Sequence, residues 1–151
     1  MKYLIKIYLE HKNNVVREIA IPSKYTLKDL HNTIIDSLEL DKNQIASFYT
    51  TNEELQLIKE IPCFKINEND TSTLDMSEIL IESIFLDVNN KLIYIYDFLK
   101  MWRFLISYSE KVEDSSQSIK IIKSIGIMPK DSPEIIFESE NNFENNINEY
   151  D

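Results

Sequence analysis

Glycine is almost absent from this chain of 151 residues, which contains one, Gly126. A Walker A loop, a Rossmann fingerprint and a Gly-x-Ser-x-Gly elbow each need at least two glycines, because their backbones turn with positive φ or approach a ligand closely. The composition therefore excludes all three motifs.

Histidine and cysteine are nearly as scarce. The two histidines, His11 and His31, are too few for a three-histidine zinc site and do not form a His-Glu-x-x-His motif. Cys63 is the single cysteine, so an internal disulfide is excluded and a reducing, cytoplasmic location is expected. We expect no metal and no other cofactor.

Long apolar runs are also missing, and none approaches the roughly 20 residues that a membrane helix needs. The N-terminal stretch MKYLIKIYLEHK is interrupted by Lys6 and is followed by no small-residue cleavage site. This indicates a strand and not a signal peptide. We expect no attachment to a membrane.

Positive charge is in the minority, since 16 Lys and Arg stand against 26 Asp and Glu, a net charge of −10. Residues 1–133 hold all 16 basic side chains and 20 acids, and residues 134–151 hold the other six acids. Binding to phosphate backbones depends on clustered Lys and Arg that release counterions. We therefore expect no non-specific binding to nucleic acid.

What is present is the composition of an ordinary globular domain, with 43% apolar and 28% charged residues. A chain of this length buries roughly 70% of the surface that its unfolded form exposes, so it needs no disulfide or metal to fold. We expect a single domain over residues 1–133 and an acidic, Asn-rich tail over 134–151. The tail is too polar to fold alone, although Phe143, Ile147 and Tyr150 are spaced for one helical face.

Alternating apolar and polar residues predict strands at 2–10, 15–21, 44–50 and 54–58, with a weaker signal for a short last strand at 119–125. Thr26 is a good N-cap and Asp29 completes a capping-box-like pair, so a helix begins there and ends near residues 38–40. The sequence DMSE (75–78) repeats the capping-box spacing and predicts a short helix or turn.

Residues 92–108, LIYIYDFLKMWRFLISY, hold two alternating, aromatic-rich runs on either side of a break. Both faces of the runs are largely apolar at the centre, which is typical of central strands that are covered on both sides. We predict that 92–98 and 102–108 pair as an antiparallel hairpin at the centre of a sheet.

A family resemblance rests on three stretches: residues 15–34 (VVREIAIPSKYTLKDLHNTI), 47–57 (SFYTTNEELQL) and 91–106 (KLIYIYDFLKMWRFLI). The first contains Arg-x-Ile, a proline and Thr-Leu-x-x-Leu-His, and the third is similar to Tyr-x-Tyr-Asp-Phe-Gly-Asp-x-Trp-x-His. In this order they resemble the plasmid pRiA4b ORF-3-like family, from about residue 3 to residue 110 with a weaker continuation to Pro133. The resemblance implies a plasmid or mobile-element context and no established activity.

The chain departs from the family pattern mainly at polar and special residues. In the third stretch, Leu99, Lys100 and Phe104 replace the family's Gly, Asp and His. Val16 replaces the family's first Trp, Glu39-Leu40 its Gly-Trp pair, and Gln44 a further His. The cysteines common in the family's C-terminal region are absent. This implies that the fold carries over better than any site.

The fold class that we predict is α+β. We expect a twisted, mostly antiparallel or mixed sheet of about six strands with one main helix packed on it. The order hairpin, helix, strand in the first half resembles a ubiquitin-like β-grasp, but the chain has no C-terminal Gly-Gly for conjugation, and topology alone does not fix function.

Asp97, at the edge of the break, is the first candidate for a site. It could pair with Arg103 across the hairpin or accept backbone N–H bonds that hold the turn, and such a structural role is the favoured interpretation. The alternative makes it an orienting carboxylate in a pocket lined by Tyr94, Tyr96 and Trp102. These aromatic rings could also stack bases, but without surrounding Lys and Arg they are better interpreted as core.

His31 and Cys63 are the remaining candidates. His31 flanks the buried stripe of the predicted helix, so we interpret it as a partly buried, hydrogen-bonded histidine in preference to a catalytic base. Cys63, beside Pro62, has no activating neighbour that the sequence identifies, so we interpret it as a buried or incidental thiol in preference to a nucleophile.

Together these observations predict a non-catalytic binding or adaptor domain, with another protein as its partner. The candidate binding residues are Asp97, Trp102, Arg103, Tyr96 and His31, and no catalytic residue is assigned. The alternative is a small hydrolase-like or metal-assisted enzyme with a site near Asp97 and His31.

Overall fold

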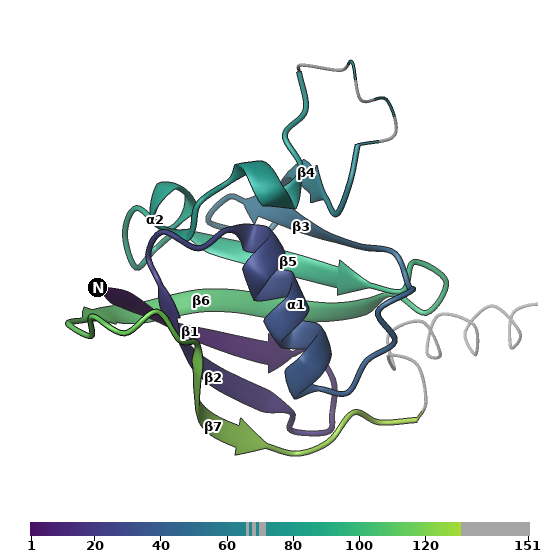
Figure 1. Cartoon of the computed structure of the whole chain (residues 1–151). Helices are drawn as coiled ribbons and strands as arrows, with labels where there is room; N and C mark the ends of the chain where they lie inside the picture. The colour runs from purple at the N-terminus through teal and green to yellow at the C-terminus, as the bar shows by residue number, and fades with distance from the viewer. Residues whose placement is uncertain (66, 68, 70–71, 131–151) are drawn as a thin grey trace, which may run out of the picture.

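A single sheet dominates the computed structural model of the chain, which describes residues 1–65, 67, 69 and 72–130. Its seven strands are β1 Lys2–Leu9, β2 Val16–Pro22, β3 Ala46–Thr51, β4 Leu57–Pro62, β5 Lys91–Tyr96, β6 Trp102–Val112 and β7 Lys120–Ile125. They lie in the order β4-β3-β5-β6-β1-β2-β7, and neighbours in that order are antiparallel (Figure 1). The α+β class and the antiparallel sheet are as predicted.

One face of the sheet is covered by α1, Leu27–Ser37 (Figure 1). The helix begins where Thr26 predicts it, because the Thr26 side chain accepts the Asp29 N–H while the Asp29 carboxylate accepts the Thr26 N–H. This reciprocal pair satisfies two of the N–H groups that a helix start leaves free. The buried stripe of α1 includes Leu27, Leu30 and Ile34.

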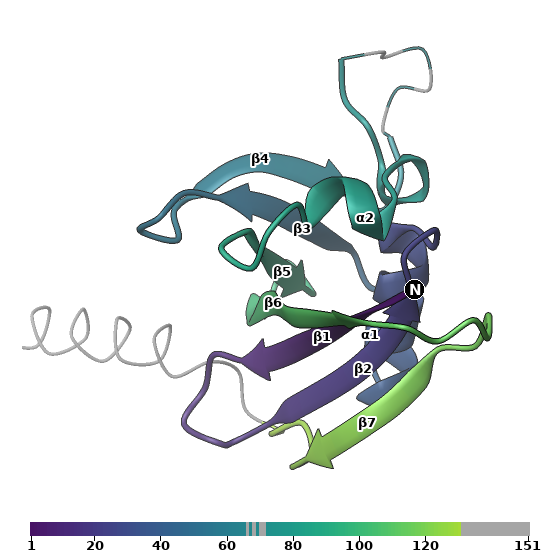
Figure 2. The same ribbon diagram turned by 90° about the vertical axis from the view of Figure 1, so that its left-hand side faces the viewer.

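Two short helical segments, η1 Met76–Glu78 and α2 Ile81–Ile84, lie beside the start of α1 (Figure 2). Asp75 caps η1 in a second capping box with Glu78, as the DMSE spacing predicts. Backbone hydrogen bonds fix the segment in place, from Leu27 N to Ile79 O and from Ile81 N to Tyr25 O.

The predicted hairpin of the opening aromatic runs is confirmed, since β5 and β6 pair with Tyr96 opposite Trp102. β6 is the fourth of the seven strands and therefore central. The side chains under α1 are almost fully buried, among them Tyr94, Trp102, Phe104 and Ile106. On the other face of β5, Ile93 and Ile95 are buried as well, so this strand is covered on both sides as expected. For β6 the expectation is wrong, because the side chains on its second face, from Arg103 to Ser107, are only partly buried.

The structure corrects two of the strand predictions. The sheet has seven strands and not about six, because the weak signal at 119–125 corresponds to β7. The strand expected at 54–58 begins at Leu57, because Asn52 folds the preceding residues into a turn. Its side-chain oxygen accepts the N–H groups of Glu54 and Gln56, and Leu55 has a φ of 59°.

Several sequence predictions are not tested by this fold. The likeness of the first half to a β-grasp stays a prediction. The tail at 134–151, with its spacing of Phe143, Ile147 and Tyr150, lies outside the described residues. Within the described part, no helix is both long enough and apolar enough to cross a membrane.

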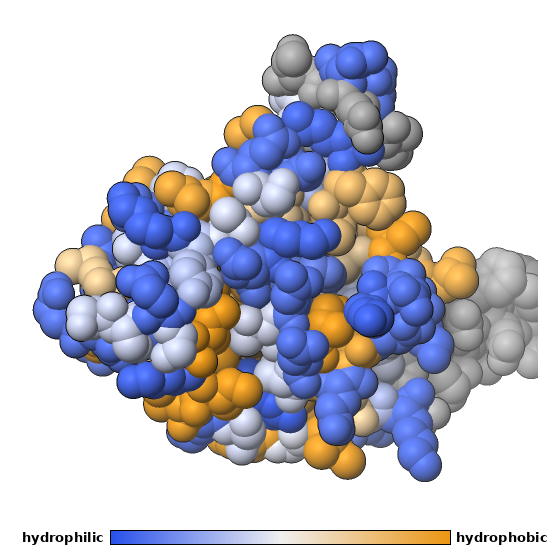
Figure 3. Space-filling view, in the orientation of Figure 1, coloured by the Kyte–Doolittle hydropathy of each residue, from blue (hydrophilic) through white to orange (hydrophobic). Residues whose placement is uncertain are grey.

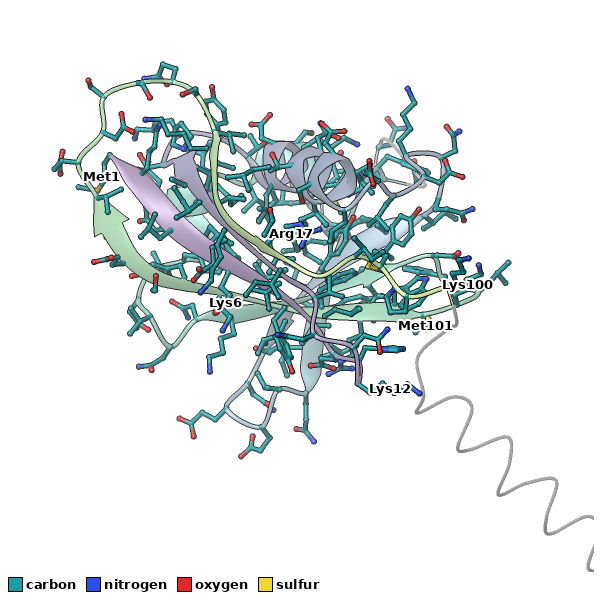
Figure 4. All side chains as sticks on the ribbon, turned by 90° about the horizontal axis from the view of Figure 1, so that it is seen from below. Met1, Lys6, Lys12, Arg17, Lys100 and Met101 are labelled. Carbon is teal, nitrogen blue, oxygen red and sulfur yellow. The ribbon has the colours of Figure 1, made fainter. Side chains whose placement is uncertain are left out.

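Gly126 directly follows β7, which is an edge strand of the sheet. It has a φ of 73°, and a Cβ atom there would lie 2.1 Å from the carbonyl oxygen of Asn14. The buried Arg17 guanidinium binds the same corner by donating to the carbonyl oxygens of Ser37, Ile125 and Gly126. Figure 4 shows Arg17 between the sheet and α1. The chain's one glycine therefore has a structural role, where only a residue without a side chain fits.

Candidate functional site

Asp97 shapes the turn between β5 and β6. Its φ is 59°, a left-handed conformation that aspartate tolerates better than most residues. Its carboxylate accepts the N–H of Leu99 at 3.2 Å, and its carbonyl oxygen accepts the N–H groups of Lys100 and Met101. Of the two structural interpretations of Asp97, these contacts therefore fit the one in which it holds the turn.

Arg103 does not pair with Asp97, so the other structural interpretation is wrong. Its Nε lies 2.8 Å from a carboxylate oxygen of Glu10, and its Nη2 donates to the Leu55 carbonyl oxygen. The physical reason is that Asp97 faces its own turn, whereas Arg103 lies on the strand face opposite to α1, beside the end of β1. Both ion-pair partners are about one third exposed, and exposed pairs of this kind contribute little stability.

The β5–β6 turn also holds the chain segment that precedes β3. The Asp97 N–H donates to the Ile45 carbonyl oxygen at 2.9 Å, and the Tyr96 hydroxyl donates to the Asp41 carbonyl oxygen at 2.7 Å. Burial raises the pKa of Tyr96 above its usual value, so this hydroxyl stays protonated as a donor. Tyr96 and Asp97 thus fix the relative positions of Ile45 and Phe98.

Between those two side chains and the loop after β4 lies a pocket of about 480 Å³. We call it the rim pocket and define it by six of its lining residues, Ile45, Ala46, Pro62, Cys63, Phe64 and Phe98. Three of these side chains are largely exposed, Phe64 at 62%, Ile45 at 55% and Phe98 at 39%. Figure 3 shows apolar side chains gathered on the right-hand side of that view, between the loop after β4 and the β5–β6 turn.

Polar groups contribute one wall of the rim pocket. The Glu60 carboxylate accepts the Ser47 hydroxyl at 2.7 Å and the Tyr49 hydroxyl at 3.2 Å. Burial, together with the neighbouring Glu60 charge, raises the pKa of Tyr49 to about 12. The Ser47, Tyr49 and Glu60 side chains are therefore hydrogen-bonded to one another. Lys65, Asn67 and Thr73 also line the pocket, so a ligand would meet polar as well as apolar groups.

Cys63 lines the rim pocket and contacts two residues of α1. The Lys28 ammonium donates to its Sγ at 2.7 Å, and His31 Nε2 lies 3.8 Å from the same sulfur. These two contacts are neighbours that the sequence around Cys63 does not identify, and the interpretation of Cys63 as a buried or incidental thiol stays a prediction. The sequence shows no sign of the grouping, because Lys28 and His31 lie 35 and 32 residues away and meet Cys63 only through the packing of α1 against the end of β4.

His31 is buried and hydrogen-bonded, as predicted. Its Nδ1 lies 2.7 Å from the Tyr94 hydroxyl, which belongs to the core. Burial, with a smaller contribution from the Lys28 charge, lowers the pKa of His31 to about 4, so the ring is neutral at pH 7. Burial also raises the pKa of Tyr94 far above its usual value. The positive charge beside the Cys63 sulfur is therefore on Lys28 and not on the imidazole.

The structure gathers four of the five candidate residues at one end of the hairpin. Tyr96, Asp97, Trp102 and Arg103 lie around the β5–β6 turn, and His31 lies separately on α1. Trp102 is a core residue, 5% exposed. In the described part of the chain, no three His, Cys, Asp or Glu side chains are grouped closely enough to hold a metal ion. As binding residues the five remain predictions.

Comparison with known proteins agrees with this architecture. A family model described as plasmid pRiA4b ORF-3-like protein matches residues 1–141 and confirms the resemblance carried by the three stretches. The chain is also similar to the crystal structure of a protein of unknown function from Methanosarcina mazei Go1. That likeness has a TM-score of 0.70 and 18% identity, covers 91% of this chain and 78% of that one, and shows the fold alone. Curated proteins give no match.

Proposed function

The chain belongs to the plasmid pRiA4b ORF-3-like family, and we propose that it is a non-catalytic binding domain that docks another protein through the rim pocket. The observation that carries this proposal is the exposure of Ile45, Phe64 and Phe98 around one pocket. Apolar side chains that are exposed together, unlike ones scattered singly, mark a surface that something covers. A plasmid or mobile-element setting and a cytoplasmic location are part of the same proposal.

A partner protein fits this surface better than a small molecule. Leu99, the chain neighbour of the pocket residue Phe98, is a further exposed apolar side chain, 94% exposed in the β5–β6 turn. A small ligand inside the pocket would leave Leu99 and most of Phe64 in water, whereas a protein surface would cover both. We therefore expect an apolar side chain of the partner to enter the pocket, with a largely apolar patch around it.

The charge of the chain restricts the partner further. The net charge of −10 attracts a protein whose contact rim is basic and disfavours one that is strongly acidic. In this proposal Tyr96 and Asp97 are positioning residues, because their hydrogen bonds hold Ile45 and Phe98 in place. Trp102 supports the hairpin from the core.

The alternative, a hydrolase-like or metal-assisted enzyme with a site near Asp97 and His31, has less support. The Asp97 carboxylate is used by the backbone of its own turn, and His31 contacts Tyr94 and Cys63. These two contact sets share no residue. An enzyme of this kind would need both side chains to act on one substrate. Their hydrogen bonds instead give each side chain a separate structural role.

The test is affinity capture from a lysate of the source organism, followed by titration of each purified, captured protein. Wild type is compared with Phe64→Ser, which removes an exposed ring from the pocket mouth. Leu86→Ser is the matched control, because Leu86 is 72% exposed but lies outside the rim pocket. We expect Phe64→Ser to weaken binding by about tenfold or more, as loss of a central aromatic contact does, and Leu86→Ser to leave it unchanged.

Two results would overturn the proposal. One is a partner whose affinity is the same for wild type and Phe64→Ser. The other is a chain that captures no protein but binds a small apolar probe, such as an anilinonaphthalene dye, inside the pocket with loss on Phe64→Ser, which would make this a small-molecule site.

A further inference from the structure

β7, Lys120–Ile125, is one of the two edge strands of the sheet, and among the described residues it pairs with β2 alone (Figure 2). The backbone groups on its other side therefore have no strand partner in that part of the chain. Two neighbouring side chains of β7 are also exposed, Ile121 at 53% and Ile122 at 57%. Open edges with apolar side chains tend to recruit other chains, and natural sheets usually cover or charge them. This edge is therefore a surface that a further segment can cover.

The charge around β7 indicates which kind of segment fits. Residues 119–130 contain three lysines and no acid, although the whole chain has a net charge of −10. Lys120 pairs with Asp114 at 3.0 Å, whereas Lys123 is exposed and makes no ion pair with any described residue. An acidic segment complements such an edge, whereas a second copy of β7 would bring like charges together.

The chain's own tail contains a segment with these properties. Residues 134–140, EIIFESE, hold three consecutive apolar side chains between Glu134 and Glu138. The family model matches residues 1–141, so it includes this segment and leaves out residues 142–151. We propose that residues 134–140 dock along the open edge of β7 and pair with its free backbone groups.

The order of residues along the chain favours this pairing. Eight residues, 126–133, connect β7 to the segment, so the segment can return beside β7 in the opposite direction. An antiparallel arrangement places Glu134 near Lys123 and Glu138 near Lys120. The three apolar side chains between the two acids then lie beside the exposed isoleucines of β7. This inference does not depend on the rim pocket, which lies toward the opposite edge of the sheet.

Hydrogen exchange of the full chain, followed by mass spectrometry, tests the pairing. Neighbouring residues of a strand point their N–H groups to opposite sides, so either Ile136→Pro or Phe137→Pro must remove a donor from the paired side. Ile147→Pro is the control, because Ile147 lies beyond the residues that the family model matches. We expect the β7 amides that face away from β2 to exchange at least about tenfold faster in one of the first two variants than in wild type, and Ile147→Pro to match wild type. Equal exchange in wild type and in both variants would overturn the proposal.

Charge reversal within the tail is the second measurement. One double variant combines Glu134→Lys with Glu138→Lys, and its control combines Glu144→Lys with Glu149→Lys. Both change the net charge by the same amount, but only the first reverses acids that lie beside β7 in the proposed arrangement. We expect the first double variant to speed exchange of the same β7 amides severalfold at low salt and the second to leave it unchanged. Identical exchange in the two double variants would show that these acids do not hold the segment, and the proposal would fail.

A second copy of the chain is the alternative occupant of this edge. Exchange of the wild-type chain is therefore measured at a low and a high protein concentration, with analytical ultracentrifugation of the same samples. Docking of the chain's own tail predicts the same protection of β7 at both concentrations, in a monomer. Protection that appears only together with a dimer would assign the edge to another copy and overturn the proposal.

Discussion

Trp102 and Leu99 lie three residues apart and occupy opposite extremes of exposure, 5% and 94%. Trp102 begins β6 and faces the core under α1, whereas Leu99 is at the tip of the turn that leads into the same strand. Both are large and apolar, so side-chain type does not explain the difference. The core and the rim pocket are therefore two apolar regions that differ in exposure, and under the proposed function the rim pocket serves for contact with a partner.

The core and the rim pocket meet at His31. Tyr94 belongs to the core, Cys63 belongs to the rim pocket, and His31 touches both. A change in the core should reach the pocket only by unfolding the domain, whereas a change at the rim should leave stability intact. The predictions below test that separation.

The largest effect is expected for Trp102→Ala. Truncation of a buried aromatic side chain leaves a cavity, and we expect the free energy of unfolding to fall by about 3–5 kcal/mol. Urea denaturation, followed by circular dichroism, measures it. A loss below about 1 kcal/mol would mean that Trp102 contributes little to the core and would remove the contrast with Leu99.

The next effect concerns His31 and pH. Its pKa is about 4 in the folded chain and near 6.5 when unfolded, so the unfolded state takes up the proton first as the pH falls. The stabilisation from the neutral ring is fully present above pH 6.5 and is lost between pH 6.5 and 4. At most one proton is involved, so wild type should lose up to about 1.4 kcal/mol per pH unit more than His31→Asn.

Unfolding free energies of wild type and His31→Asn, measured from pH 7.5 to pH 4, check this prediction. The carboxylates titrate in both proteins and cancel in the comparison. Parallel curves would mean that His31 is accessible to protons in the folded state and belongs to the rim and not to the core boundary.

A small effect on stability is expected for Leu99→Ser. The side chain is almost fully exposed, so the free energy of unfolding should change by less than about 0.5 kcal/mol. Binding to a partner identified by affinity capture should nevertheless weaken. A variant that loses stability and binding together would show that the turn is part of the core.

The last prediction is that no effect is seen: the chain should not bind duplex DNA at physiological salt. Two of the chain's cations, Lys12 and Lys100, are labelled on the right-hand side of Figure 4. Against them stands the net charge of −10. A fluorescent duplex titrated with the full chain and with a chain ending at Pro133 tests this. Salt-sensitive micromolar binding by the full chain would contradict it, and binding by the shorter chain alone would show that the acidic tail masks a basic surface.

Local signals in the sequence predicted much of the fold. The capping residues Thr26 and Asp75 mark the starts of two helical segments, and the alternation in 92–108 predicts the central hairpin. The apolar pattern places the start of β4 too early, because Asn52 uses its side chain to build a turn there. Whether a side chain or a neighbouring strand accepts such backbone N–H groups is decided by the three-dimensional context.

The departures from the family pattern show what the sequence could not decide. Two positions that are glycine in the family are Glu39 and Leu99 here. Glu39 follows α1 with a φ of 54° and keeps the left-handed conformation that glycine would favour, whereas in the β5–β6 turn the positive φ values belong to Asp97 and Met101. The Cys63 grouping was unpredictable for a different reason, since its three residues come from two distant segments and none has a motif around it.

The position of β1 has a consequence for the synthesis of the chain. β1 leaves the ribosome before the other six strands of the sheet, yet in the folded sheet it lies between β2 and β6, with Lys2 opposite both Pro22 and Val112. The hairpin with β2 can form early, but the other edge of β1 stays open until β6 has been made. At roughly 5–20 residues per second, this interval of about 90 residues lasts roughly 5–20 s. During that time the nascent chain presents an apolar strand with unpaired backbone groups, which is the kind of edge that recruits other chains. The yield of folded protein should therefore depend on translation speed and on chaperones that hold the nascent chain.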